Sequence, residues 1–385
     1  MNLHEFQAKS LFREAGIPLP FGEVVESASE AVEAAGRLGG QQWIVKAQVH
    51  AGARAAAGGV RCFSDLEKLR RYAEGMLGER LITTENAPDG QPVNHLLVEQ
   101  PCAIKKGYCL NLMFDPQRGE VIFQGGELTS VEGSYAPPSS ALFRVGVNRF
   151  SGLQNFQSRQ LAVAMGVDKA LWPPFFHLTH TLYQLFIEKD LLLIEVDTLV
   201  ESELGEMMVL NARVQVDDNA LYRQPQLAQL EDLSQDDFHH DHTHSHGLGF
   251  ISMEGDISCI VNGTGLALAT LDMIQLKGGQ VANIIDVNNE VSIETLAEAC
   301  GFVWQKEHCK SILINIVGGI VQCNIVAAGV LEAMRRYGVN CPVVARIEGS
   351  LVEEAKLLFT QAEQRVAVVQ ALDDAIVAAV KAVDS

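Results

Sequence analysis

The sequence is poor in positive charge. It contains 29 lysines and arginines against 48 aspartates and glutamates, which gives a net charge of −19 at pH 7. Such an excess of acids disfavours nucleic acid or an anionic membrane surface as a partner. Any bound phosphate must therefore be held by a locally basic site. No stretch approaches the roughly 20 consecutive apolar residues of a membrane helix, so we expect no membrane contact.

Paired cysteine motifs are also missing, because the eight cysteines are scattered and no Cys-x-x-Cys occurs. This pattern is typical of reduced cysteines in a cytoplasmic protein. The first residues, MNLHEFQAKSLFREAG, are amphipathic and contain acids, unlike a secretory or transit signal. With 385 residues the chain can form two or three domains. We therefore expect a cytoplasmic protein that acts on a small molecule.

Short strands alternate with helices along most of the chain. Residues 21–101 combine strands such as WIVKAQV (43–49) with a helix over 64–77, as a small α/β lobe would. Residues 109–126 predict a hairpin around the turn DPQRGE. From residue 256 onward, continuous apolar strands alternate with amphipathic helices, the last strand being expected over 366–372. This rhythm predicts a buried parallel sheet, whose ligands bind at the carboxyl ends of the strands.

The stretch HAGARAAAGG (50–59) has the most specific chemistry. A glycine- and alanine-rich loop that follows an apolar strand, with Lys46 inside that strand, suits a cradle for a nucleotide phosphate. The alanines at 53, 55 and 56, however, restrict positive φ and close approach of the backbone. A working phosphate loop and the relic of one both remain open from the residues alone.

Six blocks, in order, carry a family resemblance. They are MNLHEFQAKSLF, WIVKAQVHAGARAAAGGV, LIEV, DDNALYRQP, IVNGTGLALATLDMIQLKGG and NIVGGIVQCNIVAAGV. Together they resemble the β subunits of succinyl-CoA synthetase and malate–CoA ligase, over nearly the whole chain except about 124–150 and 236–250. The resemblance implies a multidomain α/β fold. An ATP-grasp domain is expected at 1–238, with 21–101 as its small lobe, and a flavodoxin-like parallel-sheet CoA-ligase domain at 239–385.

The resemblance also implies an activity. The family forms an acyl-CoA thioester from a carboxylate, here a dicarboxylate, with CoA and a nucleoside triphosphate. The expected cofactors are Mg²⁺ and ATP/ADP or GTP/GDP, with CoA bound mainly by a partner subunit. A histidine of the α subunit carries the phosphoryl group in the family. None of the eleven histidines here is therefore expected to do so, and an α-subunit partner is implied.

Site residues follow from the same resemblance. Glu195 is the predicted catalytic residue, because its family counterpart approaches the phosphohistidine. Asp197 and Asn211 are the predicted magnesium ligands; they exchange the Asn and Asp of the family and keep the summed charge, as a hard cation requires. The predicted nucleotide-binding residues are Lys46, Ala53, Arg54, Ala55, Glu99, Cys102 and Gly107, and the predicted substrate-binding residues are Asn262, Gly319, Ile320 and Val321.

Departures from the family keep alternatives open. The family loop reads Gly-Arg-Gly-Lys where residues 53–56 read Ala-Arg-Ala-Ala, and a family glycine trio is replaced at 288–290 by Asn-Asn-Glu. Gln322 and Asn324 replace a family Arg and Asp. The chain is therefore an active ligase, a ligase for another carboxylic acid, or a non-catalytic paralogue that keeps the fold and the α-subunit interface.

A histidine run follows the first expected domain and consists of His239, His240, His242, His244 and His246. In an extended segment the last four would project to one side and could clamp a transition metal. A solvated loop that binds metal only adventitiously explains the same pattern. Both interpretations stay open.

Overall fold

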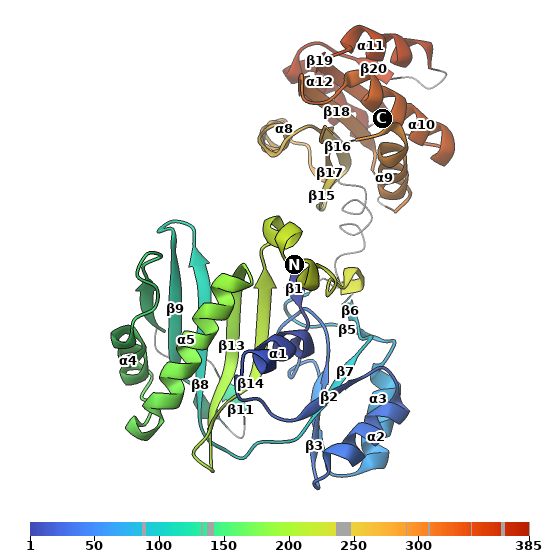
Figure 1. Ribbon diagram of the computed structural model, residues 1–385. Coiled ribbons are helices and arrows are strands. Elements are labelled where there is room, and N and C mark those ends of the chain that lie inside the picture. Colours follow the sequence, from blue (N-terminus) through green and yellow to red (C-terminus); the bar gives the residue numbers. More distant parts are fainter. Residues whose placement is uncertain are drawn as a thin grey trace. The chain divides into compact units, whose positions relative to one another are not determined.

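The computed structural model describes residues 1–86, 90–131, 134–136, 142–235, 248–289, 291–306, 309–339, 341–362 and 366–384. The chain divides into two compact units, Met1–Gln235 and Asp236–Ser385, each with its own sheets (Figure 1). The domain boundary predicted at 238/239 and the histidine run at 239–246 lie outside the described residues, as does Glu290.

A six-stranded antiparallel sheet forms the larger part of the first unit. Its order is β1 (Asn2–Leu3), β14 (Met207–Val216), β13 (Leu191–Ser202), β8 (Ile104–Asp115), β9 (Glu120–Glu127) and β12 (Phe143–Val147). β8 and β9 form the hairpin that the turn DPQRGE predicted. The helix α5 (Trp172–Glu188) crosses one face of this sheet (Figure 1). It begins with prolines in its first turn, where a missing N–H costs nothing.

Two more helices complete the large sheet's packing, α1 (Glu5–Glu14) against β14 and α4 (Asn155–Ala164) against β12. Between helices and sheet lies a core of fully buried side chains that includes Phe12, Phe123 and Phe175. The unit's shorter elements are β5 (Arg80–Leu81), β6 (Gln91–Pro92), β10 (Thr129–Val131), β11 (Ser134–Ala136), α6 (Pro225–Ala228), and the 3₁₀ turns η1 (Lys169–Leu171), η2 (Asp218–Arg223) and η3 (Leu233–Gln235).

The small lobe of the first unit is a four-stranded antiparallel sheet with two helices. The strand order is β2 (Gly22–Val25), β7 (Leu96–Glu99), β3 (Trp43–Ala47) and β4 (Val60–Phe63), and the helices are α2 (Ala28–Leu38) and α3 (Leu66–Met76). Both helices begin at a capping side chain. Ser27 accepts a bond from the N–H of Glu30, and Asp65 accepts from Glu67 and Lys68. The helix α2 was not among the predicted elements.

The second unit is a doubly wound sheet. Its strand order is β15 (Gly249–Ser252), β17 (Val281–Asp286), β16 (Ile257–Val261), β18 (Ser311–Gly318), β19 (Val343–Gly349) and β20 (Val366–Val368). From β17 to β20 all neighbours are parallel. Without β15 the order is the 2-1-3-4-5 of flavodoxin, so the predicted fold class is confirmed.

Helices cover both faces of this sheet. One hydrophobic cluster takes residues from α8 (Thr264–Leu276) and α12 (Leu372–Lys381), and the other from α9 (Ile293–Lys306), α10 (Cys323–Tyr337) and α11 (Val352–Gln361). The 3₁₀ turn η4 (Ala382–Asp384) follows α12. Two details differ from expectation. β15 adds an antiparallel edge strand, and β20 ends at Val368 because α12 already begins at Leu372.

Within the described residues, no helix combines the length and apolar character needed to cross a membrane. All eight cysteines belong to this part of the chain, and none of them forms a disulfide bond.

Candidate nucleotide and substrate sites

Lys46 is the centre of a buried cluster of charges in the first unit. From β3 its Nζ lies 2.8 Å from Glu5 Oε1 in α1 and 2.9 Å from Glu99 Oε2 in β7. Lys9 Nζ lies 2.9 Å from Glu5 Oε1 and 2.5 Å from Glu99 Oε1. All four side chains are buried. The structure thus brings the predicted Lys46 and Glu99 together. It also adds Glu5 and Lys9, which were not predicted although they are spaced i,i+4 on one helix.

The cluster stays charged because its members compensate one another. Burial alone would raise the pKa of Glu5, but Lys46, Lys9 and Arg54 hold that pKa well below its usual value. Burial likewise opposes the charged form of Lys46, yet Glu5 and Glu99 raise its pKa. For Lys9, burial prevails and lowers the pKa. The network therefore depends on the carboxylate of Glu5, which three cations share.

The phosphate-loop candidate is anchored to this cluster. Arg54 pairs through Nη2 with Glu5 Oε2 and donates through Nη1 to the carbonyl oxygen of Ala47 at 2.8 Å. Ala53 adopts a left-handed backbone with φ of 55°, whereas Ala55 does not share this conformation. Such a conformation costs a residue with a Cβ about 1–2 kcal/mol. The family's glycine at this position thus corresponds to a real backbone requirement.

Gly52, next in the same loop, donates its N–H to Glu85 Oε2 at 3.0 Å. A Cβ at position 52 would come within 2.3 Å of this carboxylate, so a larger residue there would displace the Glu85 side chain. Arg213 Nη1 lies 3.4 Å from the same Glu85 oxygen. The loop is therefore tied, through Glu85, to the large sheet. Neither Glu85 nor Arg213 was among the predicted residues.

The predicted magnesium ligands lie where β13 and β14 pair irregularly. Thr198 is opposite Asn211, and the register shifts between Glu195 and Thr198, so Asp197 lies in a bulge. Asn211 Oδ1 accepts a hydrogen bond from Lys46 Nζ at 2.6 Å, and its Nδ2 donates to Thr198 Oγ1 at 3.2 Å. Asn211 thus connects Lys46 of the small lobe to the large sheet.

Asp197 has an electrostatic signature of its own. Its side chain reaches solvent, but neighbouring protein atoms remove part of its hydration, and this, together with the nearby charge of Glu195, raises its pKa to about 6. Arg213 and Arg54 oppose this shift, and a bound cation would likewise favour the charged form of the carboxylate. The described residues contain no group of three or more His, Cys, Asp or Glu able to hold a metal. Magnesium, however, is often held by one or two protein oxygens plus substrate phosphates, and the pair Asp197 and Asn211 fits that description.

Glu195, the predicted catalytic residue, is fixed by an arginine. Its Oε2 lies 2.7 Å from Arg213 Nη2. Arg213 is the residue of β14 that pairs with Glu195 of β13. Burial opposes the charged form of Arg213, but Glu195 raises the pKa of the guanidinium. Glu195 therefore keeps a defined orientation next to Asp197.

The remaining two predicted nucleotide residues lie beyond β7. Cys102 is half-buried, and its thiol contacts the carbonyl oxygen of Ala103 at 3.7 Å. Gly107 lies buried in β8, where its carbonyl oxygen accepts a hydrogen bond from the N–H of Leu128. Having no side chain, Gly107 could contact a nucleotide only through its backbone.

The second unit has a cavity of about 350 Å³ at the carboxyl ends of its strands. Asn262 follows β16 at the point where the strand order reverses, and Ile320 and Val321 follow β18. All three line the cavity, together with Asn288 and Asn289, which replace glycines of the family. Gly319 is exposed directly before Ile320.

Asn262 uses its amide on the protein itself. Nδ2 donates to the carbonyl oxygen of Val317 and Oδ1 accepts from the N–H of Val317, both at 2.8 Å. The side chain thus fixes the end of β18, where the segment 319–321 begins. The helix α10 begins at Cys323, with Gln322 as its N-cap.

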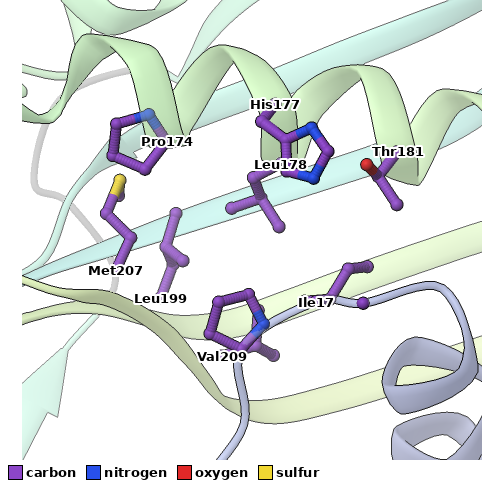
Figure 2. A pocket seen from close by; sticks show the side chains of 10 residues that line it. Ile17, Pro174, His177, Leu178, Thr181, Leu199, Met207 and Val209 are labelled. Atoms are coloured by element: carbon purple, nitrogen blue, oxygen red, sulfur yellow. The ribbon is translucent and has the colours of Figure 1, made fainter.

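A separate apolar cavity of about 70 Å³ lies in the first unit, where α5 faces β13 and β14 (Figure 2). His177 and Leu178 of α5, Ile17, and Leu199, Met207 and Val209 of the two strands surround it. None of the predicted site residues lines it, so it is no part of the candidate site.

The chain matches the ATP-grasp domain family over residues 2–201 and the CoA-ligase family over residues 260–381. It is 43% identical to the ADP-forming succinate–CoA ligase subunit beta of Halorhodospira halophila, over 100% of this chain and 98% of that protein. It belongs to the succinate–CoA ligase β-subunit family. The counterpart from Methylobacillus flagellatus is 40% identical over 100% of both chains.

The expected family and the order of its two domains are thus confirmed, and the domain set is that of a nucleotide-dependent acid–CoA ligase. Among solved structures, ATP citrate lyase from Methanothrix soehngenii in complex with citrate and coenzyme A has a TM-score of 0.70 at 14% identity, covering 96% of each chain. That likeness shows the fold.

Proposed function

We propose that this chain is the β subunit of an acid–CoA ligase, that it binds Mg-ATP or Mg-ADP in its first unit, and that an α subunit completes the enzyme. The observation that carries the proposal is the convergence of Lys46, Glu99 and Asn211, which join two sheets through direct contacts. The relatives are named ADP-forming, which favours an adenine nucleotide over a guanine nucleotide. Their names also favour succinate as the acid.

Phosphoryl transfer depends mainly on positioning and on charge neutralisation. Arg54 offers a planar fork of donors to phosphate oxygens. Lys46 has four protein acceptors within 2.9 Å, namely Glu5, Glu99, Asn211 and the Leu210 carbonyl. A phosphate that takes the donor now bonded to Asn211 would make Asn211 Oδ1 available to a cation.

Asp197 and Asn211 would hold Mg²⁺, which neutralises the phosphate oxygens when bound. Glu195, oriented by Arg213, would meet the histidine that the α subunit presents. Because this chain supplies no phosphocarrier histidine in the proposal, the α subunit is an obligatory partner and also carries most of the CoA site. The cytoplasmic location expected from the cysteines remains a prediction.

The cavity at Asn262, Ile320 and Val321 is the proposed carboxylate site. Gly319 and Ile320 are exposed, and backbone N–H groups bind anions where several of them converge. Asn262 would act by holding β18 in register rather than by contact, because both of its polar atoms bond to Val317.

The test is co-purification with an α subunit of a succinate–CoA ligase, followed by two assays. Incubation with Mg-ATP should phosphorylate a histidine of the α subunit, and addition of CoA with succinate should release a thioester. Other four- and five-carbon dicarboxylates test whether the chain is a ligase for another acid. A complex that neither accepts phosphate nor forms a thioester with any of them would contradict the proposal.

The hydrogen bonding of Lys46 also favours a second candidate, a non-catalytic paralogue. With all three of its protons used on protein acceptors, Lys46 has no donor ready for phosphate. On this reading the chain keeps the α-subunit interface as a scaffold. It predicts that the complex forms normally while Mg-ADP fails to bind.

A further inference from the structure

Two cysteines of the second unit lie in direct contact. Cys309 Sγ and Cys341 Sγ are 3.9 Å apart, although 32 positions separate them in the sequence. Cys309 lies just before β18 and Cys341 just before β19, and these strands are parallel neighbours (Figure 1). The N–H of Ile312 donates to the carbonyl oxygen of Pro342 at 2.9 Å, which holds the two chain segments together beside the thiols.

The pair is also chemically distinct from the chain's other cysteines. The hydrogen bond from Cys309 lowers the pKa of the Cys341 thiol. Burial raises the pKa of Cys259 to about 12, and it also raises the pKa of Cys300 and Cys323. Both contacting cysteines are half-buried, whereas Cys259 and Cys300 are buried. The thiolate is the reactive form of cysteine, which makes Cys341 the attacking group of the pair.

We infer that Cys309 and Cys341 form a redox modification site that closes to a reversible disulfide. With a hydroperoxide as oxidant, the Cys341 thiolate attacks the O–O bond and becomes a sulfenic acid, while the leaving oxygen takes a proton as water or alcohol. The Cys309 thiol then attacks the sulfenic sulfur, forms the S–S bond and releases water. Two thiols are oxidised and one hydroperoxide is reduced. A small dithiol reverses the reaction by exchange.

The position of the pair determines the effect. The cysteines lie at the amino ends of β18 and β19, whereas the cavity lies at the carboxyl ends. At those far ends the same strands are in close contact, since a Cβ on Gly349 would come within 1.8 Å of the Gly318 carbonyl oxygen. A link at Cys309 therefore joins two strands at the end away from the ligand. It stabilises the unit and leaves the cavity open.

The experiment treats the native full-length chain with hydrogen peroxide and digests it with trypsin after blocking the remaining thiols. The linked product joins peptides 307–310 and 337–346 and has lost two hydrogen atoms. It should form in the Cys62→Ser control, which lacks an exposed cysteine, and be absent in Cys341→Ser. Oxidation should raise the thermal midpoint of the second unit by about 5–10 °C, and dithiothreitol should reverse the shift.

Two results would overturn the inference. One is oxidation of Cys62 under conditions that leave peptides 307–310 and 337–346 unlinked. The other is a linked product whose formation leaves the thermal midpoint unchanged, because a bond made in the native contact must stabilise the folded unit. The Cys309→Ser variant, which conserves volume at the contact, should show neither the link nor the shift.

Discussion

Gly52 and Arg213 share one oxygen of Glu85. The N–H of Gly52 donates to Glu85 Oε2 at 3.0 Å, and Arg213 Nη1 lies 3.4 Å from that same oxygen. Arg213 in turn holds Glu195. The Glu85 carboxylate therefore already accepts the hydrogen bond of a backbone N–H in the phosphate-loop candidate. A phosphate that binds this N–H has to displace the carboxylate.

Glu85→Gln should bind Mg-ADP about fivefold more tightly than the native chain, because a neutral acceptor bonds the loop more weakly than a carboxylate and repels phosphate less. Isothermal calorimetry measures the difference. Glu79→Gln is the matched control, since it removes the same charge from an exposed position in the same lobe. Equal gains in both variants, or weaker binding by Glu85→Gln, would show that Glu85 does not compete with the nucleotide.

Ala53 and Ala55 should respond oppositely to replacement by glycine. Ala53 has a φ of 55°, so Ala53→Gly relieves strain and should raise the free energy of unfolding by about 0.5–1 kcal/mol. Ala55→Gly relieves none and should lower it by a similar amount, about 0.5–1 kcal/mol. Urea unfolding of both variants decides the point, and changes of the same sign would contradict the left-handed conformation at Ala53.

The same replacements, combined with Ala56→Lys, restore the family loop. In the complex with the α subunit this triple variant should raise kcat/KM for the nucleotide without creating an activity that the native chain lacks. The loop of the native chain would then be weakened but working. Thioester formation by the restored variant alone would instead identify HAGARAAAGG as a relic.

Glu5 should be the residue on which the first unit's stability depends most. Its carboxylate serves Lys9, Lys46 and Arg54 while its side chain is 1% exposed. Glu5→Gln leaves Glu99 as the one carboxylate, among the described residues, paired with Lys9 and Lys46, and should lower the free energy of unfolding by about 3 kcal/mol. Glu14→Gln, exposed on the same helix, should change it by less than about 0.5 kcal/mol. Similar effects of the two substitutions in urea unfolding would exclude this role.

The phosphate loop begins at a histidine that resists protonation. Both ring nitrogens of His50 are buried without a hydrogen-bond partner, and its ring lies 4.5 Å from that of His4. Burial, with a smaller contribution from His4, lowers the pKa of His50 to about 4, although Asp232 opposes the shift. Between the unfolded pKa of about 6.5 and this value, only the unfolded chain binds the proton.

Stability should therefore fall as the pH is lowered through that window. From about pH 7.5 to about pH 5, His50 should cost the folded state about 2 kcal/mol. Urea unfolding at the two pH values measures the loss, which should shrink in His50→Gln and persist in His177→Gln, a change at an exposed histidine. An identical loss in both variants would mean that other groups cause it.

Strand and helix order in the second unit was readable from the sequence, because its buried parallel strands are continuous apolar runs separated by amphipathic helices. The edge strand β15 was not predicted. It has only four residues, and its antiparallel pairing with β17 depends on partners 31 to 37 positions away rather than on any local pattern. The helix α2 was also missed, and its buried face consists of the small side chains of Ala31, Ala34 and Ala35.

The candidate site was predictable only where the family resemblance names a residue. Lys46 and Glu99 were identified in this way, and the structure joins them. The partners that hold them were not, because the contacts Lys46–Glu5 and Arg213–Glu85 span 41 and 128 positions. No local spacing pattern predicts contacts between residues so far apart in the sequence. Asn262 shows the converse, since it lines the cavity of the second unit while its amide is committed to Val317.

The central claim is that Asp197 and Asn211 form a magnesium site with exchanged side chains, and calorimetry of Mg-ADP binding tests it most directly. The native chain should bind Mg-ADP at millimolar concentration or below and lose magnesium-dependent binding in Asp197→Ala. The double variant Asp197→Asn with Asn211→Asp should retain that binding, because the pair keeps its charge and its oxygens. No binding by the native chain, or a double variant as inactive as Asp197→Ala, would contradict the account.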